Sequence, residues 1–133
     1  MSGYHPNQSL SQEDALTGGK LASDLDQLAR TLLVSKIKTH EQAREHLNAA
    51  KGYEEFIRSS KGKLGKTELD GAYQGAFLSF ARAARAEDAV RILFDWTKAV
   101  PGSKLMDSAV PQQAGDLLIR GYFKEAALLF RES

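Results

Sequence analysis

The chain has 133 residues, of which 42% are hydrophobic and 26% charged, a composition ordinary for one globular domain. It contains no cysteine, which excludes disulfides, thiolate catalysis and cysteine-based zinc sites. Its net charge of +1 lacks the basic excess typical of nucleic-acid-binding domains, and no apolar run reaches the length of a membrane span.

The N-terminal residues 1–19 predict an extension that precedes a single domain of residues 20–133. Pro6, Gly18 and Gly19 interrupt any sustained period, and only Gln12–Leu16 indicates a short helical turn. The first 20 residues carry acidic side chains and no arginine, unlike a secretory signal or a transit peptide. We therefore expect an organelle presequence to be absent or already removed.

The pattern becomes helical from Leu21 onward. Apolar residues recur at spacings of 4, 3 and 4, which is typical of one face of an amphipathic helix (Leu21, Leu25, Leu28, Leu32). A second helix is expected to begin at Thr39, because Gln42 completes a capping-box pattern. Residues 58–66 are rich in Gly, Ser and Lys and contain no acidic residue, which predicts a loop.

Four more helices follow this loop. Thr67 is the expected cap of the third, residues 84–86 form a tight turn before the fourth, and Pro101 ends the fourth. A fifth helix is expected from about Pro111, a residue suited to a first helical turn, and a sixth runs through Phe130 to the end. No segment alternates with period 2, so the sequence predicts an all-α protein.

The helix pairs repeat one another along the chain. Setting Ala89 over Ala126 gives a period of 37 residues and brings Ala84 over Gly121 at the inter-helix turn. A weaker copy sets Ala43 over Ala89, a spacing of 46 residues. Because one helical hairpin cannot bury its apolar face alone, the repeat predicts a stack of about three antiparallel hairpins, an α-solenoid.

The segment from Ala72 to Trp96 resembles a pentatricopeptide repeat without a gap. Tyr73 takes the aromatic position, Ala84 the turn and Ala89 the small residue, and Trp96 takes the final apolar position. The resemblance extends more weakly over residues 26–133, and tetratricopeptide repeats share much of the same pattern.

The positions that read bases in this family depart from its pattern. RNA-reading members carry a small polar residue after the aromatic position, where it hydrogen-bonds one base per repeat. Here these positions hold Leu28, Gln74 and Pro111, and only Gln74 could make such a bond. Reading at most about three bases at roughly 1–3 kcal/mol each would give little specificity. The resemblance therefore favours the fold over sequence-specific RNA recognition.

The resemblance implies a non-catalytic accessory or scaffold subunit that binds a folded protein in a larger assembly. Short pentatricopeptide-like proteins without base-reading residues are similar to subunits of mitochondrial complexes, such as the mitoribosome or the catalytic head of euglenozoan mitochondrial ATP synthase. We accordingly expect a mitochondrial location, or otherwise a cytoplasmic one, with no cofactor, metal, catalytic residue or membrane insertion. The alternatives are an RNA-binding module that uses Gln74 and Arg82, and a tetratricopeptide-like adaptor for short peptides.

The predicted loop carries the densest basic cluster, Arg58, Lys61, Lys63 and Lys66. These cations could contact an acidic partner surface, or a phosphate backbone in the RNA alternative. Phe94 falls off the apolar stripe of its helix, which predicts an exposed aromatic anchor for a partner.

Two segments approach known site motifs without matching them. Residues 60–67 (SKGKLGKT) resemble a phosphate-binding loop but lack its first glycine and follow a predicted helix where that motif needs a strand. His40 and His46 (HEQAREH) are six residues apart, so on one helix they would face apart, unlike the i, i+4 pair of zinc proteases. We interpret the first as a solvated linker and expect His46 to be exposed or half-buried.

Overall fold

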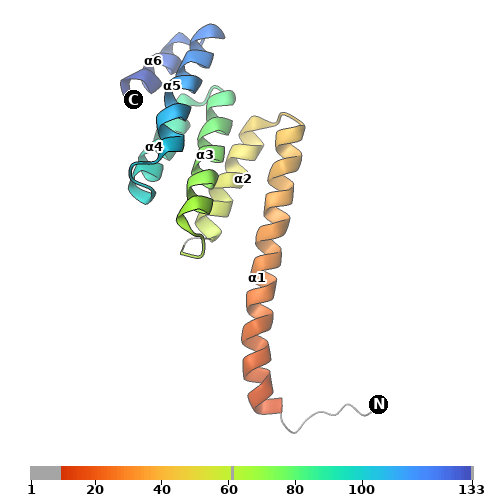
Figure 1. The fold of residues 1–133 in the computed structure, drawn as a ribbon. Helices are drawn as coiled ribbons and strands as arrows, with labels where there is room; N and C mark the ends of the chain where they lie inside the picture. The colour runs from red at the N-terminus through yellow and green to blue at the C-terminus, as the bar shows by residue number, and fades with distance from the viewer. Residues whose placement is uncertain (1–9, 61, 133) are drawn as a thin grey trace. The chain divides into compact units, whose positions relative to one another are not determined.

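A computed structural model describes the backbone of residues 10–60 and 62–132 and the side chains of residues 21–60 and 62–131. Its helices are α1 (Leu10–Gln42), α2 (His46–Ser59), α3 (Lys66–Arg82), α4 (Ala86–Ala99), α5 (Lys104–Ile119) and α6 (Phe123–Glu132) (Figure 1). The described residues contain no strand, which confirms the all-α prediction.

The chain divides into two compact units, residues 1–32 and 33–133. Residues 10–19 form the first turns of α1, whereas the sequence predicted an extension there; residues 1–9 lie outside the described part. Leucine, alanine and glutamine favour the helix in this segment and offset the cost of about 1 kcal/mol for each of its two glycines. The division into units falls after Leu32, not after Gly19.

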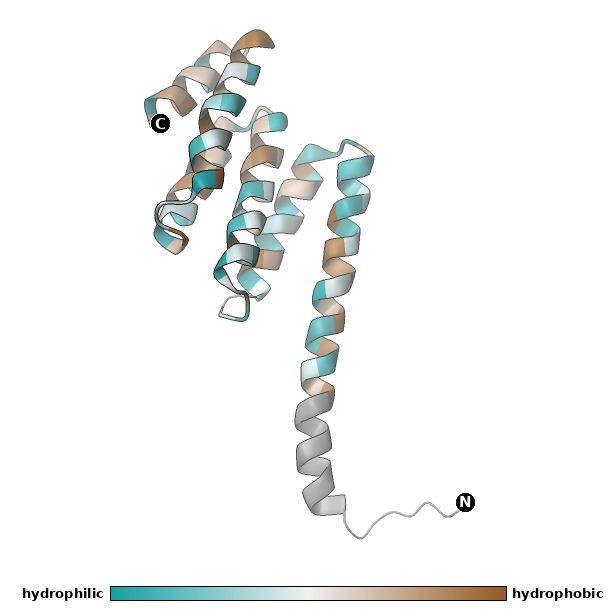
Figure 2. Cartoon of the chain, in the orientation of Figure 1, coloured by the Kyte–Doolittle hydropathy of each residue, from teal (hydrophilic) through white to brown (hydrophobic). Residues whose placement is uncertain are grey.

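The leucines of α1 in the first unit follow the predicted helical stripe. Apolar residues recur between polar ones along this part of α1 (Figure 2). Every member of the stripe is more than half exposed, so the period correctly predicted the helix but not a buried face (Leu21, Leu25, Leu28, Leu32).

The second unit contains the same turn three times. Arg44, Ala84 and Gly121 follow α1, α3 and α5, and all have positive φ, at 59°, 59° and 90°. In each turn the amide of the next residue donates to the carbonyl five residues earlier at 2.9 Å (Glu45 to His40, Arg85 to Phe80, Tyr122 to Leu117). This bond, with a second one from the positive-φ residue, defines the Schellman helix end.

These turns set the register of the repeat. Arg44 aligns with Ala84 at a spacing of 40 residues, and Ala84 aligns with Gly121 at 37. The predicted spacing of 37 residues between Ala84 and Gly121 at two equivalent turns is confirmed, but the spacing of 46 for the first copy is wrong. The error came from Thr39, which lies in the last turns of α1 instead of opening a helix, and whose hydroxyl donates to the Ser35 carbonyl at 3.0 Å.

Two other helix starts differ from the prediction. The cap of α3 is Gly65 and not Thr67, and the Gly65 amide donates to Glu68 Oε1 at 3.3 Å. The cap of α5 is Ser103, whose hydroxyl accepts from the Met106 amide at 3.2 Å. The expected start at Pro111 is therefore wrong, because this proline lies within the helix. Burial of apolar α5 residues on both sides of Pro111 offsets a proline cost of about 3 kcal/mol.

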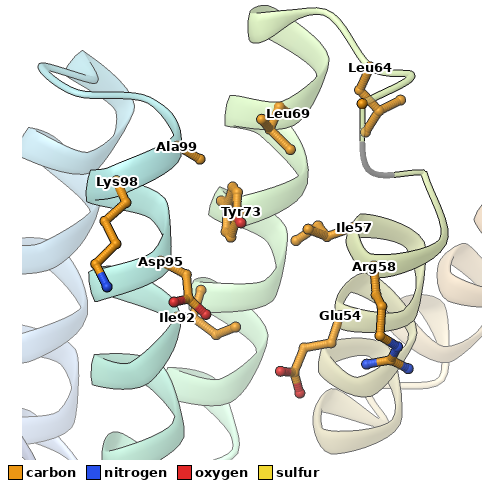
Figure 3. A pocket seen from close by; sticks show the side chains of 11 residues that line it. Glu54, Ile57, Arg58, Leu64, Leu69, Tyr73, Ile92, Asp95, Lys98 and Ala99 are labelled. Carbon is orange, nitrogen blue, oxygen red and sulfur yellow. The ribbon is translucent and has the colours of Figure 1, made fainter.

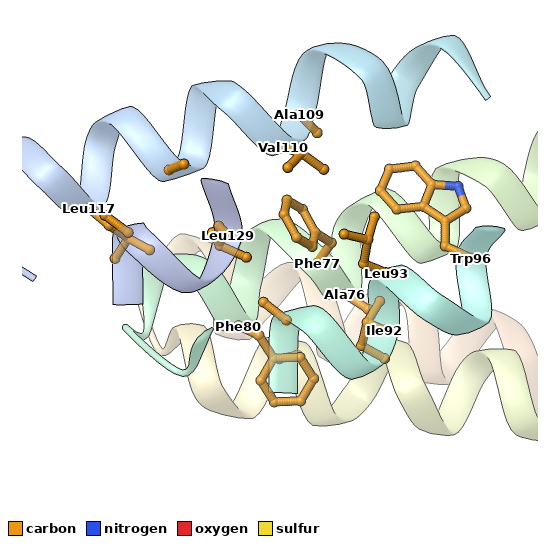
Figure 4. Close-up of a cluster of buried hydrophobic side chains, with 14 of the residues drawn as sticks. Ala76, Phe77, Phe80, Ile92, Leu93, Trp96, Ala109, Val110, Leu117 and Leu129 are labelled. Carbon is orange, nitrogen blue, oxygen red and sulfur yellow. The ribbon is translucent and has the colours of Figure 1, made fainter. Parts of the chain in front are cut away.

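The core of the second unit lies mainly between α3, α4, α5 and α6, and α2 contributes Ala50 (Figure 4). The rings of Phe77 and Trp96 meet at a centroid distance of 6.0 Å and a tilt of 50°. Phe80 and Leu117 are also buried, and Tyr73 packs against the cluster while half-buried. These aromatic side chains therefore form the centre of the core.

Polar contacts fix consecutive helix pairs against each other. Helix α3 contacts α2 and α5, and α4 contacts α6. The Asp70 carboxylate on α3 accepts from Trp96 Nε1 at 2.7 Å and from the Ser103 hydroxyl at 2.6 Å. Arg120 at the end of α5 donates to the Ala81 and Arg82 carbonyls, both at 3.2 Å, where α3 ends. Helix α3 is therefore linked to α5 at both ends.

Candidate functional site

An open groove of about 500 Å³ lies between α2, α3 and α4, beside the loop that joins α2 to α3 (Figure 3). Its volume lies within the range of small-ligand and peptide-side-chain pockets, roughly 300–1,000 Å³. Apolar groups from all three helices and the loop form much of its lining (Ile57, Leu64, Leu69, Tyr73, Ile92, Ala99).

Charged side chains line the groove from two sides. Glu54 and Arg58 come from α2, and Asp95 and Lys98 come from α4 (Figure 3). Arg91 holds Glu54 in place through a 2.5 Å ion pair that links α4 to α2. The groove thus combines an apolar lining with charges of both signs, as in the core and rim of protein interfaces.

Arg91 is anchored by two acids. Its guanidinium donates to Glu54, and at 3.2 Å to Asp88, and the bond to Glu54 is the main cause that raises the pKa of Arg91 above its usual value. The ion pair of Arg91 and Glu54 links α4 to α2, so the charge of Arg91 is not available to a ligand.

Tyr73 places a neutral hydroxyl in the groove. Burial raises the pKa of this phenol above its usual value, and the nearby Asp95 carboxylate raises it further. The hydroxyl is therefore protonated at neutral pH and can donate or accept a hydrogen bond. Together these groups suit an apolar side chain of a polypeptide flanked by charged or polar groups.

The structure brings one residue of the predicted basic cluster to this groove. Arg58 lines it, whereas Lys63 and Lys66 are exposed on the loop and at the start of α3 without lining it. Lys61 lies outside the described residues. Phe94 is 55% exposed, which confirms its predicted exposure, but it does not line the groove. Its role as an anchor stays a prediction.

Gln74 and Arg82, the residues of the RNA alternative, lie on α3 and do not line the groove. Gln74 is half-buried and Arg82 is exposed. The corrected register places Val34, not Leu28, at the first position equivalent to Gln74.

A basic region gathers at the turn ends of the three helix pairs. The pKa of His46 is lowered by burial and by the positive charges of Arg82, Arg120 and Arg44, in that order, against a smaller opposing effect of Glu41. His46 itself is half-buried, as expected. The three arginines are far apart in sequence, so only the packing of the turns shows that they share one region.

Sequence reasoning missed the acidic residues of the groove and the residues that α4 contributes to it. Glu54, Asp95 and Lys98 carry no motif, and their convergence depends on which faces of α2 and α4 meet across α3. The only local signal was the i, i+3 spacing of Asp95 and Lys98, which puts them on one side of a helix.

The structure shows where the two segments that approach known site motifs lie. Residues 60–67 follow α2, a helix, as the linker interpretation expected. His40 and His46 lie on different helices, and His40 Nδ1 contacts Glu45 Oε1 at 2.6 Å. Within the described ranges, no group of three or more His, Cys, Asp or Glu residues could hold a metal ion. In the same part of the chain, no helix has the length and apolar character needed to cross a membrane.

Comparisons with protein-family models, with characterised proteins and with solved structures gave no significant match.

Proposed function

We propose that this chain is a non-catalytic helical-repeat subunit, an accessory or scaffold protein that binds a folded partner in a larger assembly. The three Schellman turns at equivalent positions, and the packing of α5 on α3 and of α6 on α4, support a solenoid of three helical hairpins. Such repeats offer extended surfaces for partner binding.

The groove between α2, α3 and α4 is the observation that carries the binding role. Its apolar lining, the neutral Tyr73 hydroxyl and the charges of Arg58 and Lys98 fit a protein surface better than a small charged metabolite. Arg58 and Lys98 favour an acidic residue on the partner surface. An apolar residue of the partner, beside the acidic one, enters the groove.

We further propose that the assembly is a mitochondrial complex, such as the catalytic head of ATP synthase or the mitoribosome. The resemblance of residues 72–96 to a pentatricopeptide repeat supports this extension, together with the poor match at the base-reading positions. Detection of the tagged chain outside mitochondria by cell fractionation would refute this part alone.

The test is affinity capture of the tagged full-length chain from its source cells, with the partner quantified relative to the chain. We expect a stoichiometric partner that survives RNase. Arg58→Glu combined with Lys98→Glu should reduce the partner at least tenfold, since both groove cations are reversed. Lys36→Glu combined with Lys38→Glu makes the same charge change on exposed α1 residues and should stay within twofold. Recovery of the chain alone would overturn the proposal.

The basic region around His46 favours an RNA-binding module as a second candidate. Arg44 and Arg82 could contact a phosphate backbone, a mode of binding that weakens steeply with salt, whereas Arg120 is paired with Asp116 at 3.0 Å. The test is the affinity for single-stranded RNA at several salt concentrations, with Arg82→Ala expected to lower both the affinity and the salt dependence. Absence of binding at low salt would remove this candidate.

A further inference from the structure

Among the described helices, the α5–α6 pair packs against α3–α4 on one side, and the repeat period shows which of its faces no described helix covers. Helices α3 and α4 pack against α5 and α6, and Ala81, Ala86 and Leu93 on this pair are 0%, 3% and 7% exposed. Contacts across this junction include Arg120 to the Ala81 carbonyl and Thr97 to Met106.

A shift of 37 residues maps these positions onto Leu118, Phe123 and Phe130. They are 46%, 66% and 47% exposed, and each is at least as large as its buried counterpart. Apolar residues are visible at the α5–α6 turn in Figure 2. An end repeat that faces water needs a polar outer face to keep the protein soluble. This face is instead apolar at the positions that stacking buries one repeat earlier.

A polar position repeats along with the apolar ones. Asp70, which accepts from the hydroxyl of Ser103, maps onto Asp107 in the first turn of α5. Ser103 is the N-cap of the helix that stacks on α3. Asp107 is exposed, and by this mapping the N-cap hydroxyl of a further stacked helix would lie within reach of its carboxylate.

Ala127 belongs to the same face, because it is exposed and maps onto Val90, which is half-buried against the core. We propose that this end face, formed by Asp107, Leu118, Phe123, Ala127 and Phe130, docks a helical hairpin of a partner protein. The first helix of that hairpin begins at a Ser or Thr whose hydroxyl donates to Asp107. This proposal rests on the proposed function and names the partner's contact element. A second copy of this chain fits less well, because its own Ser103 hydroxyl already donates to Asp70 and is not free to reach Asp107.

The absence of cysteine allows a direct test on the full chain. Ala127→Cys places a thiol within the end face, and Ser108→Cys places one on α5 outside it. Ser108 maps onto Gly71, which stays exposed although α5 covers α3. In the captured assembly we expect maleimide labelling at position 127 to slow at least tenfold relative to the isolated chain. Labelling at position 108 should change less than twofold.

Substitutions then test the chemistry of the docking. Phe123→Ser with Phe130→Ser should reduce the captured partner at least tenfold, because buried aromatic anchors dominate interface affinity. Asp107→Ala should reduce it about fivefold or more, whereas Leu25→Ser, at an exposed apolar position of α1, should leave the captured partner unchanged. All variants should keep the wild-type thermal midpoint within a few degrees, since each changes an exposed residue.

The outcomes separate this proposal from the proposed function. A stoichiometric partner with unchanged labelling at position 127 would overturn the end-face docking and leave the proposed function intact. Slow labelling in the isolated chain at high concentration would assign the face to a second copy and overturn the partner hairpin. Capture of the chain alone would overturn both proposals.

Discussion

Replacing Asp70 by alanine is the sharpest test of how the helix pairs are held together. One carboxylate oxygen of Asp70 accepts from Trp96 Nε1 at 2.7 Å and from the Ser103 hydroxyl at 2.6 Å. It therefore joins α3, α4 and the start of α5. The indole of Trp96 is fully buried, so removal of the carboxylate takes away the acceptor of a buried donor.

The magnitude follows from these contacts. A buried donor left without a partner costs about 1–3 kcal/mol, and bonds to a charged acceptor lie at the upper end of that range. Loss of the bond to Ser103 adds a smaller amount, because the Ser103 hydroxyl still accepts from the Met106 amide. We expect Asp70→Ala to lower the free energy of unfolding by about 2–4 kcal/mol. For a domain near 100 residues this corresponds to a fall in Tm of roughly 10–20 °C.

The assay is urea denaturation followed by fluorescence of Trp96, the single tryptophan of the chain. Asp107→Ala is the matched control, because Asp107 occupies the equivalent position one repeat later and is exposed. It should change the stability by no more than about 0.5 kcal/mol. Equal effects of the two substitutions, or an Asp70→Ala protein within about 0.5 kcal/mol of wild type, would refute the reasoning.

Three further predictions concern stability. Gly75→Ala should lower the free energy of unfolding by about 1–3 kcal/mol, because the added Cβ would overlap the ring of Tyr53. Gly71→Ala in the same helix meets no atom within 4 Å and should raise it by about 1 kcal/mol. Chemical denaturation measures both, and a stabilised Gly75→Ala protein would contradict the packing of α2 on α3. Ala84→Gly should stabilise the protein by up to about 1 kcal/mol, since glycine relieves the positive φ of 59° at this turn; a loss of stability would count against the Schellman geometry. The lowered pKa of His46 means that the unfolded chain binds this proton first, so the unfolding free energy should fall as the pH drops below about 6.5 and level off below the folded-state pKa. His46→Gln should remove this component from a pH series of denaturation curves, and an unchanged pH profile would show that neither burial nor the arginines lower the pKa of His46.

The helices were predictable because their apolar stripes follow the helical period, and the covered face of the second unit holds the aromatics that this period selects. The predicted helix boundaries were wrong where one residue type can play either of two roles. Thr39 can cap a helix or donate back within one, and Pro111 can open a helix or sit inside it. In both cases the packing of neighbouring helices decided the outcome, which local sequence does not encode.

The candidate site was predictable only in part. The basic composition of the loop indicated Arg58, which lines the groove, and the off-stripe position of Phe94 indicated its exposure. Asp95 and Lys98 became part of a site only because α4 packs beside α3 and faces α2. The end face follows from the period of 37 residues together with the exposure of Phe123, and the period alone could not show which face stays uncovered.

The most direct test of the central claim is the mass of the native particle that carries this chain, measured in a gentle extract of its source cells before and after RNase. A protein-binding subunit should migrate in a particle much larger than the chain alone, at a fixed stoichiometry and with no change after RNase. A particle of the mass of one chain, or one that collapses on RNase treatment, would contradict the account.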